Sequence, residues 1–305
     1  MNSTEKVVGF ISNHLVDTKI YLNEDMKKHT TFKTGGTADL MIEAQSITQL
    51  QILMKYILRE KIPYVILGHG SNVLIGDQGI REVVIKIEDN LKRITVEGEK
   101  IDAEAGALLA DASKYAQKHG LSGVEFASGI PGTVGGAVVM NAGAYGGEIK
   151  DVLEEVQVIT ADGELLVRKS DELEFGYRTS SIQRNGDIVI KAKLSLKKGD
   201  QKAIKNYMDE LTRKREQSQP LEYPSAGSVF KRPEGYYTGK LIQDAGLQGY
   251  QIGGAQVSTK HAGFIVNANN ATTRDILNLI NHIQNEVKRL YNVELKTEVK
   301  VLGEL

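Results

Sequence analysis

The sequence predicts a mixed fold of helices and short strands that is divided among two or three domains. Its 305 residues are 41% hydrophobic and 25% charged, which is enough to form a large core. A chain of this length is more often divided among several domains than folded around a single core. Stretches with apolar residues at helical spacing alternate with short apolar runs typical of strands. Near residue 200 the composition shifts to a charged helical stretch, and we expect a domain boundary there.

The composition excludes several classes of protein. The formal net charge is −1 with basic and acidic residues interspersed, so no nucleic-acid partner is expected. The absence of cysteine excludes disulfides, thiolate metal sites, iron–sulfur clusters and cysteinyl attachment of a flavin, and no metal site is predicted. The sequence shows neither a signal peptide nor a run of apolar residues long enough to span a membrane. We therefore expect a cytoplasmic protein with no membrane partner and no evident obligate protein partner.

The N-terminal part predicts helices and strands in alternation. A first helix, capped by Ser3 or Thr4, has an apolar face formed by Val7, Phe10, Ile11 and Leu15. A strand from Ala38 to Glu43 follows. Ser46 with Gln49 three residues later is a capping-box pattern, and it precedes an apolar stripe of Leu50, Leu53, Met54, Ile57 and Leu58. Apolar runs at 64–67 and 73–75 then enclose a loop with the sequence GHGSN.

The rest of the chain adds a glycine-rich segment and two long helices. After a strand at 83–87, a helix from about Leu108 to Lys118 ends at Gly120. Residues 123–147, GVEFASGIPGTVGGAVVMNAGAYGG, are dense in glycine but are not a repetitive linker. Further elements are strands at 156–160 and 187–196, a helix at 201–217, a helix with Ile276, Leu279, Ile280, Ile283, Val287 and Leu290 on one face, and a final strand from about Val293 to Leu302.

The two glycine-rich loops are suited to binding an anion. Such loops let backbone amides approach phosphate oxygens without interference from side chains. However, GHGSN lacks the third glycine of a dinucleotide-binding fingerprint and leads into a strand, so a Rossmann fold is not supported. The segment GYYTGK at 235–240 is one residue too short for a Walker A loop. Taken alone, the loops fit either tight structural turns or a phosphate-bearing cofactor.

Three motifs in this order and spacing resemble the UDP-N-acetylenolpyruvoylglucosamine reductase family. They are Gly68-His69-Gly70-Ser71-Asn72, Ser128-Gly129-Ile130-Pro131-Gly132 running on to Gly135-Gly136, and the segment MNAGAYG at 140–146. Tyr177-Arg178, AGSVFK at 226–231 and Glu298-Val299-Lys300 extend the match over roughly residues 29–303. The resemblance implies an α+β fold with a vanillyl-alcohol-oxidase (PCMH)-type FAD-binding domain of two lobes, 1–75 and 76–200, and a substrate domain at 201–305. It also implies the compact subtype, which lacks a substrate-capping tyrosine loop.

The resemblance assigns most of the glycine-loop residues to FAD. Those at the pyrophosphate and its neighbours are Gly68, His69, Gly70, Ser71, Asn72, Ser128, Gly129, Ile130, Pro131 and Gly132, and those along the flavin are Gly136, Asn141 and Gly143. The FAD is expected to be non-covalent, and we interpret His69 as an exposed loop residue because histidyl attachment needs a different loop context. His29 stands where the family leads us to expect an aromatic tyrosine, which argues against a stacking role there.

The resemblance also implies the reaction. NADPH would reduce FAD, and the reduced flavin would then deliver a hydride to the enolpyruvyl ether of UDP-N-acetylglucosamine, giving UDP-N-acetylmuramate for peptidoglycan synthesis. Arg178 and Glu298 would stabilise the enolate, with Glu298 most effective as a protonated acid, and Ser228 would donate the proton. Contacts with the substrate are implied for Tyr177, Lys240, Lys260 and His261. The only partners expected are two small molecules, NADPH and the enolpyruvyl ether of UDP-N-acetylglucosamine.

Structural interpretations of the same residues remain open. Arg178 could be a surface ion-pair partner, Ser228 a turn hydroxyl and Glu298 a solvated strand residue, while Lys240 and Lys260 could be merely exposed. Two other functions also remain open. One is an FAD-dependent oxidase of the same superfamily, which gives no reason for the serine and the glutamate in a separate C-terminal domain. The other is a non-catalytic protein that binds nucleotides on the same scaffold.

Overall fold

A computed structural model describes residues 2–15 and 17–305, and the chain divides into two compact units. Unit 1 is made of Met1–Leu22, Leu40–His69 and Glu82–Lys214, and unit 2 of Asn23–Asp39, Gly70–Arg81 and Arg215–Leu305. Unit 2 therefore combines the C-terminal part of the chain with two short N-terminal segments. The division into two lobes and a substrate domain at residues 75 and 200 remains a prediction.

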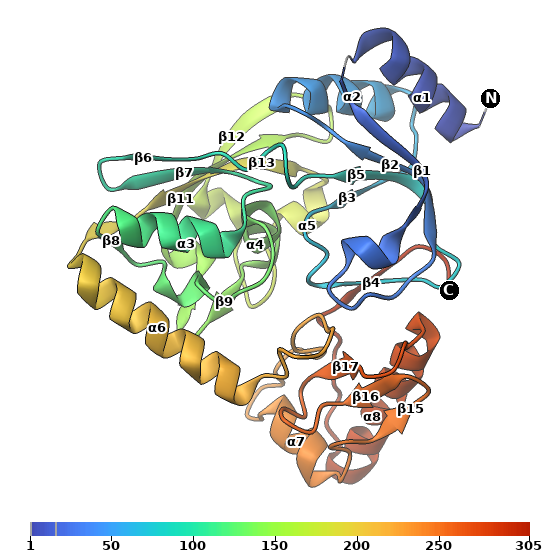
Figure 1. The fold of residues 1–305 in the computed structure, drawn as a ribbon, viewed down its shortest axis with the longest axis vertical. Coiled ribbons are helices and arrows are strands. Elements are labelled where there is room, and N and C mark those ends of the chain that lie inside the picture. The colour runs from blue at the N-terminus through green and yellow to red at the C-terminus, as the bar shows by residue number, and fades with distance from the viewer. Residues whose placement is uncertain (1, 16) are drawn as a thin grey trace. The chain divides into compact units, whose positions relative to one another are not determined.

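The N-terminal helices of unit 1 lie along a four-stranded sheet (Figure 1). The strands, in the order β1-β2-β5-β3, are Lys19–Asp25, Thr37–Glu43, Ile80–Lys86 and Tyr64–Leu67, and β3 runs parallel to β5 with Tyr64 opposite Val83. The helices are α1 (Ser3–His14) and α2 (Ile47–Arg59). Four of the five residues of the predicted stripe of α2 are buried in one core with residues of β2 and β5, and Leu58 is partly buried against the same core.

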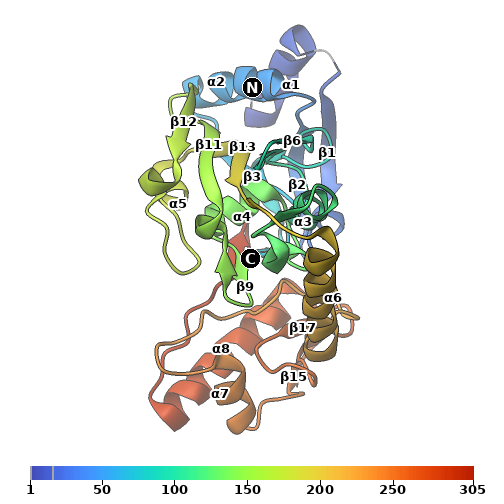
Figure 2. The same cartoon turned by 90° about the vertical axis from the view of Figure 1, so that its left-hand side faces the viewer.

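A five-stranded antiparallel sheet forms the rest of the core of unit 1. Its order is β12-β11-β13-β7-β6, with bounds Leu165–Lys169, Leu153–Ile159, Ile188–Ser195, Lys100–Glu104 and Ile94–Glu97. Two helices, α3 (Leu109–Lys118) and α4 (Val134–Met140), pack against it (Figure 2). Gly120 follows α3 with a φ of 65°, so this helix ends as predicted.

Several further elements complete unit 1. Two-stranded pairs are β9 with β10 (Gly143–Ala144, Gly147–Glu148) and β8 with β14 (Leu121–Ser122, Lys197–Lys198). Helical elements are α5 (Ile182–Asn185), α6 (Gln201–Ser218, in unit 1 up to Lys214) and the 3₁₀ turns Glu125–Ala127, Ile149–Asp151 and Ser170–Leu173. The glycine-rich segment at 123–147 includes the turn Glu125–Ala127 and strand β9, and it ends at the first residue of β10.

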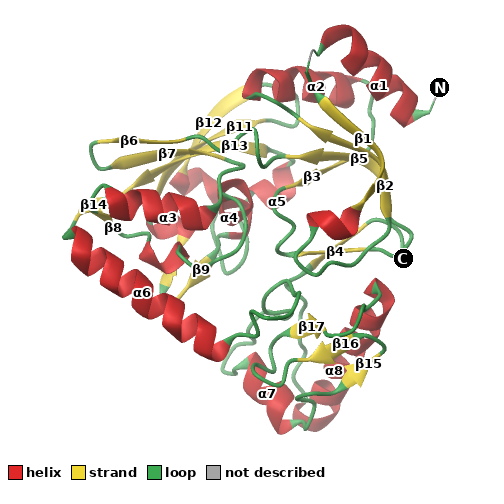
Figure 3. Cartoon of the chain, viewed as in Figure 1, coloured by secondary structure: helices red, strands yellow, loops and turns green. Residues whose placement is uncertain are grey.

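Unit 2 has its own core between a small sheet and the longest helix of the described chain (Figure 3). The sheet β15-β16-β17 comprises Gln251–Ile252, Ala255–Val257 and Ile265–Asn267, and it packs on α8 (Thr273–Tyr291). The other elements are α7 (Thr238–Asp244), a 3₁₀ turn at Met26–His29, and β4 (Val73–Ile75) parallel to β18 (Lys300–Leu302). Asp77 links the segment after β4 to α8, because its carboxylate accepts the backbone N–H groups of Thr273 and Arg274 at 2.8 and 3.0 Å.

Two predictions about helix starts are wrong in detail. Ser3 and Thr4 are helical residues, and Asn2 caps α1 in a capping box with Glu5. Ser46 caps α2 as predicted, but the side-chain oxygen of Gln49 accepts the N–H of Gln45 at 3.0 Å. Caps depend on side-chain rotamers, which sequence spacing alone does not determine.

Two predictions about the C-terminal part also need correction. Leu290 lies outside the buried face of α8 and is 44% exposed. The expected strand from Val293 to Leu302 is a strand only at its end, Lys300–Leu302. The preceding residues change backbone partners, since Glu298 N–H donates to Val229 and Lys300 N–H donates to Asn72. A segment that pairs with two different neighbours in turn cannot form one continuous ladder.

Candidate active site

Within unit 1, the first glycine loop and the second meet. A Cβ added to Gly68, at the end of β3, would lie 2.6 Å from Oγ1 of Thr133. Thr133 is buried and caps α4 by accepting the N–H of Gly136 at 3.3 Å. Gly132 has a φ of 121°, which glycine adopts without strain. Two motifs that are about sixty residues apart in the sequence are therefore brought together, and their binding of one ligand stays a prediction.

The second loop has the polar groups that a bound pyrophosphate requires. Among the described residues, the backbone N–H groups of Gly129, Gly132 and Thr133 donate no hydrogen bond within the protein. Ser128 Oγ is buried and also has no partner there. Such buried or converging donors usually mark a ligand, because unpaired buried polar groups are costly. The loop therefore fits the anionic centre of FAD.

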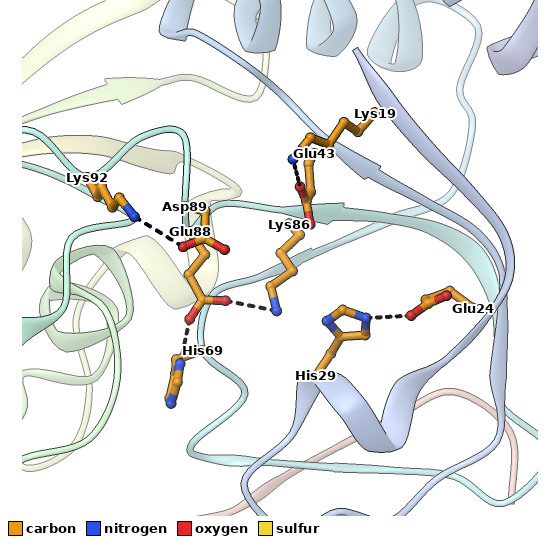
Figure 4. A network of polar contacts seen from close by, with 9 residues as sticks. All are labelled: Lys19, Glu24, His29, Glu43, His69, Lys86, Glu88, Asp89 and Lys92. Carbon is orange, nitrogen blue, oxygen red and sulfur yellow. Dashed lines mark hydrogen bonds and ion pairs between the residues drawn. The ribbon is translucent and has the colours of Figure 1, made fainter. Parts of the chain in front are cut away.

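His69 is part of an ion-pair network in unit 1 (Figure 4). Its Nδ1 lies 2.5 Å from Oε1 of Glu88, and Nζ of Lys86 lies 2.8 Å from Oε2 of the same carboxylate. This hydrogen bond with Glu88 raises the pKa of His69, and the bond from His69, followed by that from Lys86, lowers the pKa of Glu88 to about 2. The His69 side chain is 39% exposed. The side chain of this loop residue is thus held by Glu88, and more than a third of it is exposed to solvent.

The remainder of the first loop belongs to unit 2. Gly70 has a φ of 69°, and a Cβ there would lie 2.1 Å from the carbonyl oxygen of His29. This contact gives Gly70 a structural reason to be glycine, independent of any cofactor. Figure 4 shows the imidazole of His29 beside Glu24, with Nε2 3.0 Å from the carboxylate, which lowers the pKa of Glu24. Ser71 is half-buried.

Arg178 lies in unit 1 next to the third motif. One guanidinium nitrogen, Nη2, donates to the carbonyl oxygen of Gly143 at 2.9 Å. Asn141 is fully buried and left-handed, with a φ of 43°, and its Nδ2 donates to the carbonyl of Gly176 at 3.0 Å and to Glu148 at 2.6 Å. The side-chain amide of Asn141 is thus engaged within the protein, next to the turn that carries Arg178.

Ser228 and Glu298 lie on adjacent backbone segments of unit 2. The N–H of Glu298 donates to the carbonyl of Val229, the residue after Ser228, at 2.8 Å. Asn72 lies against the same segment, because its Nδ2 donates to the carbonyl of Glu298 at 3.3 Å. Ser228 Oγ donates to the carbonyl of Phe230 at 3.1 Å. Two predicted catalytic residues and one predicted cofactor residue therefore meet in one place.

The residues predicted to contact the substrate have different surroundings. His261 is half-buried beside Ser228: a Cβ added to Gly263 would lie 3.0 Å from the imidazole and 3.6 Å from Ser228 Oγ. Burial lowers the pKa of His261, whose Nδ1 accepts the N–H of Gly263. Lys260 reaches the carbonyl of Glu216 at 2.6 Å. Lys240 forms an exposed ion pair with Asp244 on α7, and Tyr177 is 50% exposed with its ring 5.2 Å from the Arg178 guanidinium.

Sequence reasoning missed the residues that hold the predicted ones. Glu88, Thr133 and Gln183 contact predicted site residues, and Lys86 pairs with Glu88. Thr133 lies within the second motif, but the other three stand in no recognisable motif. Lys86 could have been suspected, since a lysine that ends an apolar strand needs a counter-charge if it is buried. Within the described residues, no group of three or more histidine, aspartate or glutamate side chains is arranged to hold a metal ion. No helix in that part of the chain is long and apolar enough to cross a membrane.

The fold is that of an FAD-binding oxidoreductase with a vanillyl-alcohol-oxidase-type FAD domain and a C-terminal α+β domain. A family profile described as an FAD binding domain matches residues 38–168, and one described as the C-terminal domain of UDP-N-acetylenolpyruvoylglucosamine reductase matches residues 219–302. Phl p 4.0202, a glucose dehydrogenase, shares the fold at 14% identity, with a TM-score of 0.50 over 66% of this chain and 45% of the other.

The full-length relatives identify the family. A reductase with this name from Caldanaerobacter subterraneus is 52% identical to the chain, over 98% of the chain and 99% of its own length. One from Listeria welshimeri is also 52% identical, over 100% of the chain and 100% of its own length. A crystal structure of UDP-N-acetylenolpyruvylglucosamine reductase from Thermus caldophilus matches with a TM-score of 0.81 at 36% identity, covering 93% of this chain and 98% of the other. The chain belongs to the UDP-N-acetylenolpyruvoylglucosamine reductase family.

Proposed function

We propose that the chain reduces UDP-N-acetylglucosamine enolpyruvate to UDP-N-acetylmuramate in the cytoplasm, with electrons taken from NADPH. The observation that carries this proposal is the identity of about half of all residues with reductases of that name along their whole length. In the balanced reaction, NADPH and one proton are consumed, the alkene gains one hydride and one proton, and NADP⁺ is released. The reduction supplies a peptidoglycan precursor.

The residues that would hold FAD lie at the junction of the two glycine loops in unit 1. Gly129, Gly132, Thr133 and Ser128 offer donors to the pyrophosphate, and their lack of partners among the described residues supports this assignment. When bound, FAD supplies the hydride chemistry that no amino-acid side chain can provide. The protein's own contribution is to orient the substrate and to stabilise charge.

Arg178 is proposed to bind the carboxylate of the enolpyruvyl group. Arrival of a hydride at the terminal carbon pushes negative charge through the alkene into that carboxylate. A guanidinium held in place lowers the barrier because it interacts more strongly with this developing charge than with the ground state. The hydrogen bond from Nη2 to Gly143 supports such a fixed position. The planar donors of arginine also suit a carboxylate.

Glu298 and Ser228 are proposed to complete the reaction. Glu298 would act on the enolate as a hydrogen-bonding acid, and Ser228 would give its proton to the carbon next to the carboxylate. Their adjacent backbones in unit 2 support a shared role. The Ser228 hydroxyl donates to the Phe230 carbonyl in this structure, so it must rotate away from that acceptor to serve as the donor.

The two half-reactions test these roles separately. We expect Ser228→Ala to retain FAD and to be bleached by anaerobic NADPH at the wild-type rate, because that step needs no proton from the serine. Return of the colour on addition of the enolpyruvyl substrate should be slowed by about a hundred- to ten-thousand-fold, the usual effect of losing a general acid. Stopped-flow absorbance follows both steps. Ser12→Ala, which also removes a hydroxyl bonded to a backbone carbonyl, is the matched control.

Three results would contradict the proposal in different ways. A protein without a flavin spectrum that still binds the nucleotide would support a non-catalytic protein. Reoxidation by oxygen at a rate that exceeds that with the enolpyruvyl substrate would support an oxidase. Wild-type reoxidation of Ser228→Ala by the substrate would return the serine to its structural interpretation. Glu298→Gln, which keeps the hydrogen bonding but removes the acid, should slow only the second half-reaction, by about a hundred- to a thousand-fold.

A further inference from the structure

The turn that carries Arg178 has a backbone conformation that arginine disfavours. Gly176 and Thr179 exchange backbone hydrogen bonds of 3.1 and 3.3 Å, which closes a four-residue turn with Arg178 at its third position. The φ of Arg178 is 55°. A positive φ at this position normally selects glycine or asparagine. A larger residue persists there only where the surroundings impose the conformation, and such strain is concentrated at functional sites.

Two side chains from outside the turn impose it. Nε2 of Gln183 donates to the carbonyl of Arg178 at 3.3 Å and to the carbonyl of Val139 at 2.8 Å. Nδ2 of Asn141 donates to the carbonyl of Gly176 at 3.0 Å. Together these bonds hold two backbone carbonyl groups of the turn, that of Gly176 before Tyr177 and that of Arg178 after it. Neither amide interacts with the guanidinium itself in these contacts.

Both tethers are fixed to the C-terminal end of α4. Val139 lies in the last turn of this helix, where carbonyl groups lack partners within the helix, and Asn141 is its C-cap. Gln183 lies on α5, which packs beside α4 in both views (Figures 1 and 2). The opposite end of α4 follows the loop proposed to hold the pyrophosphate. One short helix therefore connects that loop to the turn.

We propose that Gln183 and Asn141 are positioning residues that hold Arg178 in its left-handed conformation and thereby fix the guanidinium against the substrate carboxylate. This inference rests on the role of Arg178 in the proposed function. Without the tether, the turn relaxes toward an ordinary conformation and the guanidinium moves away from its place. The guanidinium stabilises the developing charge only from its position beside the substrate carboxylate. Its displacement therefore slows reduction of the substrate but does not weaken binding of FAD.

The test is a double-mutant cycle on the flavin-loaded enzyme. Gln183→Leu removes the donor at little change in size, and Ser180 Oγ continues to satisfy the Val139 carbonyl at 2.8 Å. We expect bleaching by NADPH to be unchanged and reoxidation by the enolpyruvyl substrate to be slowed by up to about 100-fold, the effect of a displacement of about 1 Å at a reacting centre. In an Arg178→Ala background, Gln183→Leu should cause no further slowing.

Controls separate positioning from general damage. Gln201→Leu removes another glutamine that donates to a backbone carbonyl, that of Lys118, and should leave both half-reactions unchanged. Gln183→Glu keeps the size but replaces the donor with an acceptor, so it should also slow only the second half-reaction. If either Gln183 variant loses flavin or slows both half-reactions equally, Gln183 supports the whole fold and the inference is overturned.

The failure of this inference can be distinguished from failure of the proposed function. If Arg178→Ala reoxidises with substrate at the wild-type rate, the role proposed for Arg178 is wrong and the positioning role falls with it. If Arg178→Ala is slow but Gln183→Leu is not, only the positioning role is wrong. The same conclusion holds if Gln183→Leu slows the second half-reaction as much in the Arg178→Ala background as in the wild type, because the two residues would then act independently.

Discussion

Replacement of Glu88 by glutamine should destabilise unit 1 in a pH-dependent manner. This carboxylate accepts from His69 and from Lys86, whose side chain is only 9% exposed. The fall in its pKa from 4.5 to about 2 corresponds, at about 1.36 kcal/mol per pKa unit, to about 3 kcal/mol favouring the ionised form. Because His69 is 39% exposed, solvent screening reduces this figure, but Glu88→Gln also removes the carboxylate that pairs with the buried Lys86. We expect a loss of about 2 kcal/mol near pH 6.

The pH dependence follows from the two titrating partners. Stability contributed by Glu88 is present above its ordinary pKa of 4.5 and is lost as the pH falls from there to about 2. The pKa of His69 is raised, so its contribution is complete below its ordinary pKa of 6.5 and is lost as the pH rises through the higher folded value. The difference between wild type and Glu88→Gln should therefore be largest between about pH 4.5 and 6.5.

The assay is urea unfolding followed by circular dichroism at each pH, with the flavin concentration held constant because bound ligand adds stability. Glu294→Gln is the control, because it removes a carboxylate from an exposed pair with Lys288 and should produce no measurable change. A loss of stability that is the same from pH 3 to pH 9 would refute this reasoning, since it would point to packing and not to the ion pairs.

Four further predictions can be tested, and the first three rest on the described contacts. Gly136→Ala should fold, because Gly136 is exposed at the start of α4 and an added Cβ would meet only Thr133, at 3.5 Å. It should retain less FAD, seen as a lower flavin-to-protein ratio, because the family resemblance places Gly136 along the flavin. Arg178→Gly should be more stable in urea than Arg178→Ala by about 0.5–1 kcal/mol, since glycine avoids the strain of a positive φ. Asp77→Ala should lose about 0.5–2 kcal/mol through its cap on α8, and equal stability to wild type would contradict that role. Acid precipitation should release all the flavin, as expected of a non-covalent cofactor.

Much of the local structure follows from the sequence alone. The apolar stripe after Ser46 predicts α2 because residues at helical spacing share one face. The same reasoning predicts the buried apolar residues of α8, but it wrongly includes the exposed Leu290. The three glycine-containing motifs, with their order and spacing, identify the family before any fold is known. Their glycines at 70 and 132 have the positive φ angles that only glycine adopts easily.

Only the tertiary structure decides which distant residues meet. It brings Gly68 against Thr133, pairs His69 with Glu88, and places Gln183 on the carbonyl of Arg178. It also divides the predicted final strand, because residues 296–300 pair with two neighbours in turn. Hydrophobic periodicity is a property of consecutive residues and survives in any fold that buries the face. Hydrogen bonds between residues far apart in sequence depend on how sheets and loops pack, and no local pattern records them.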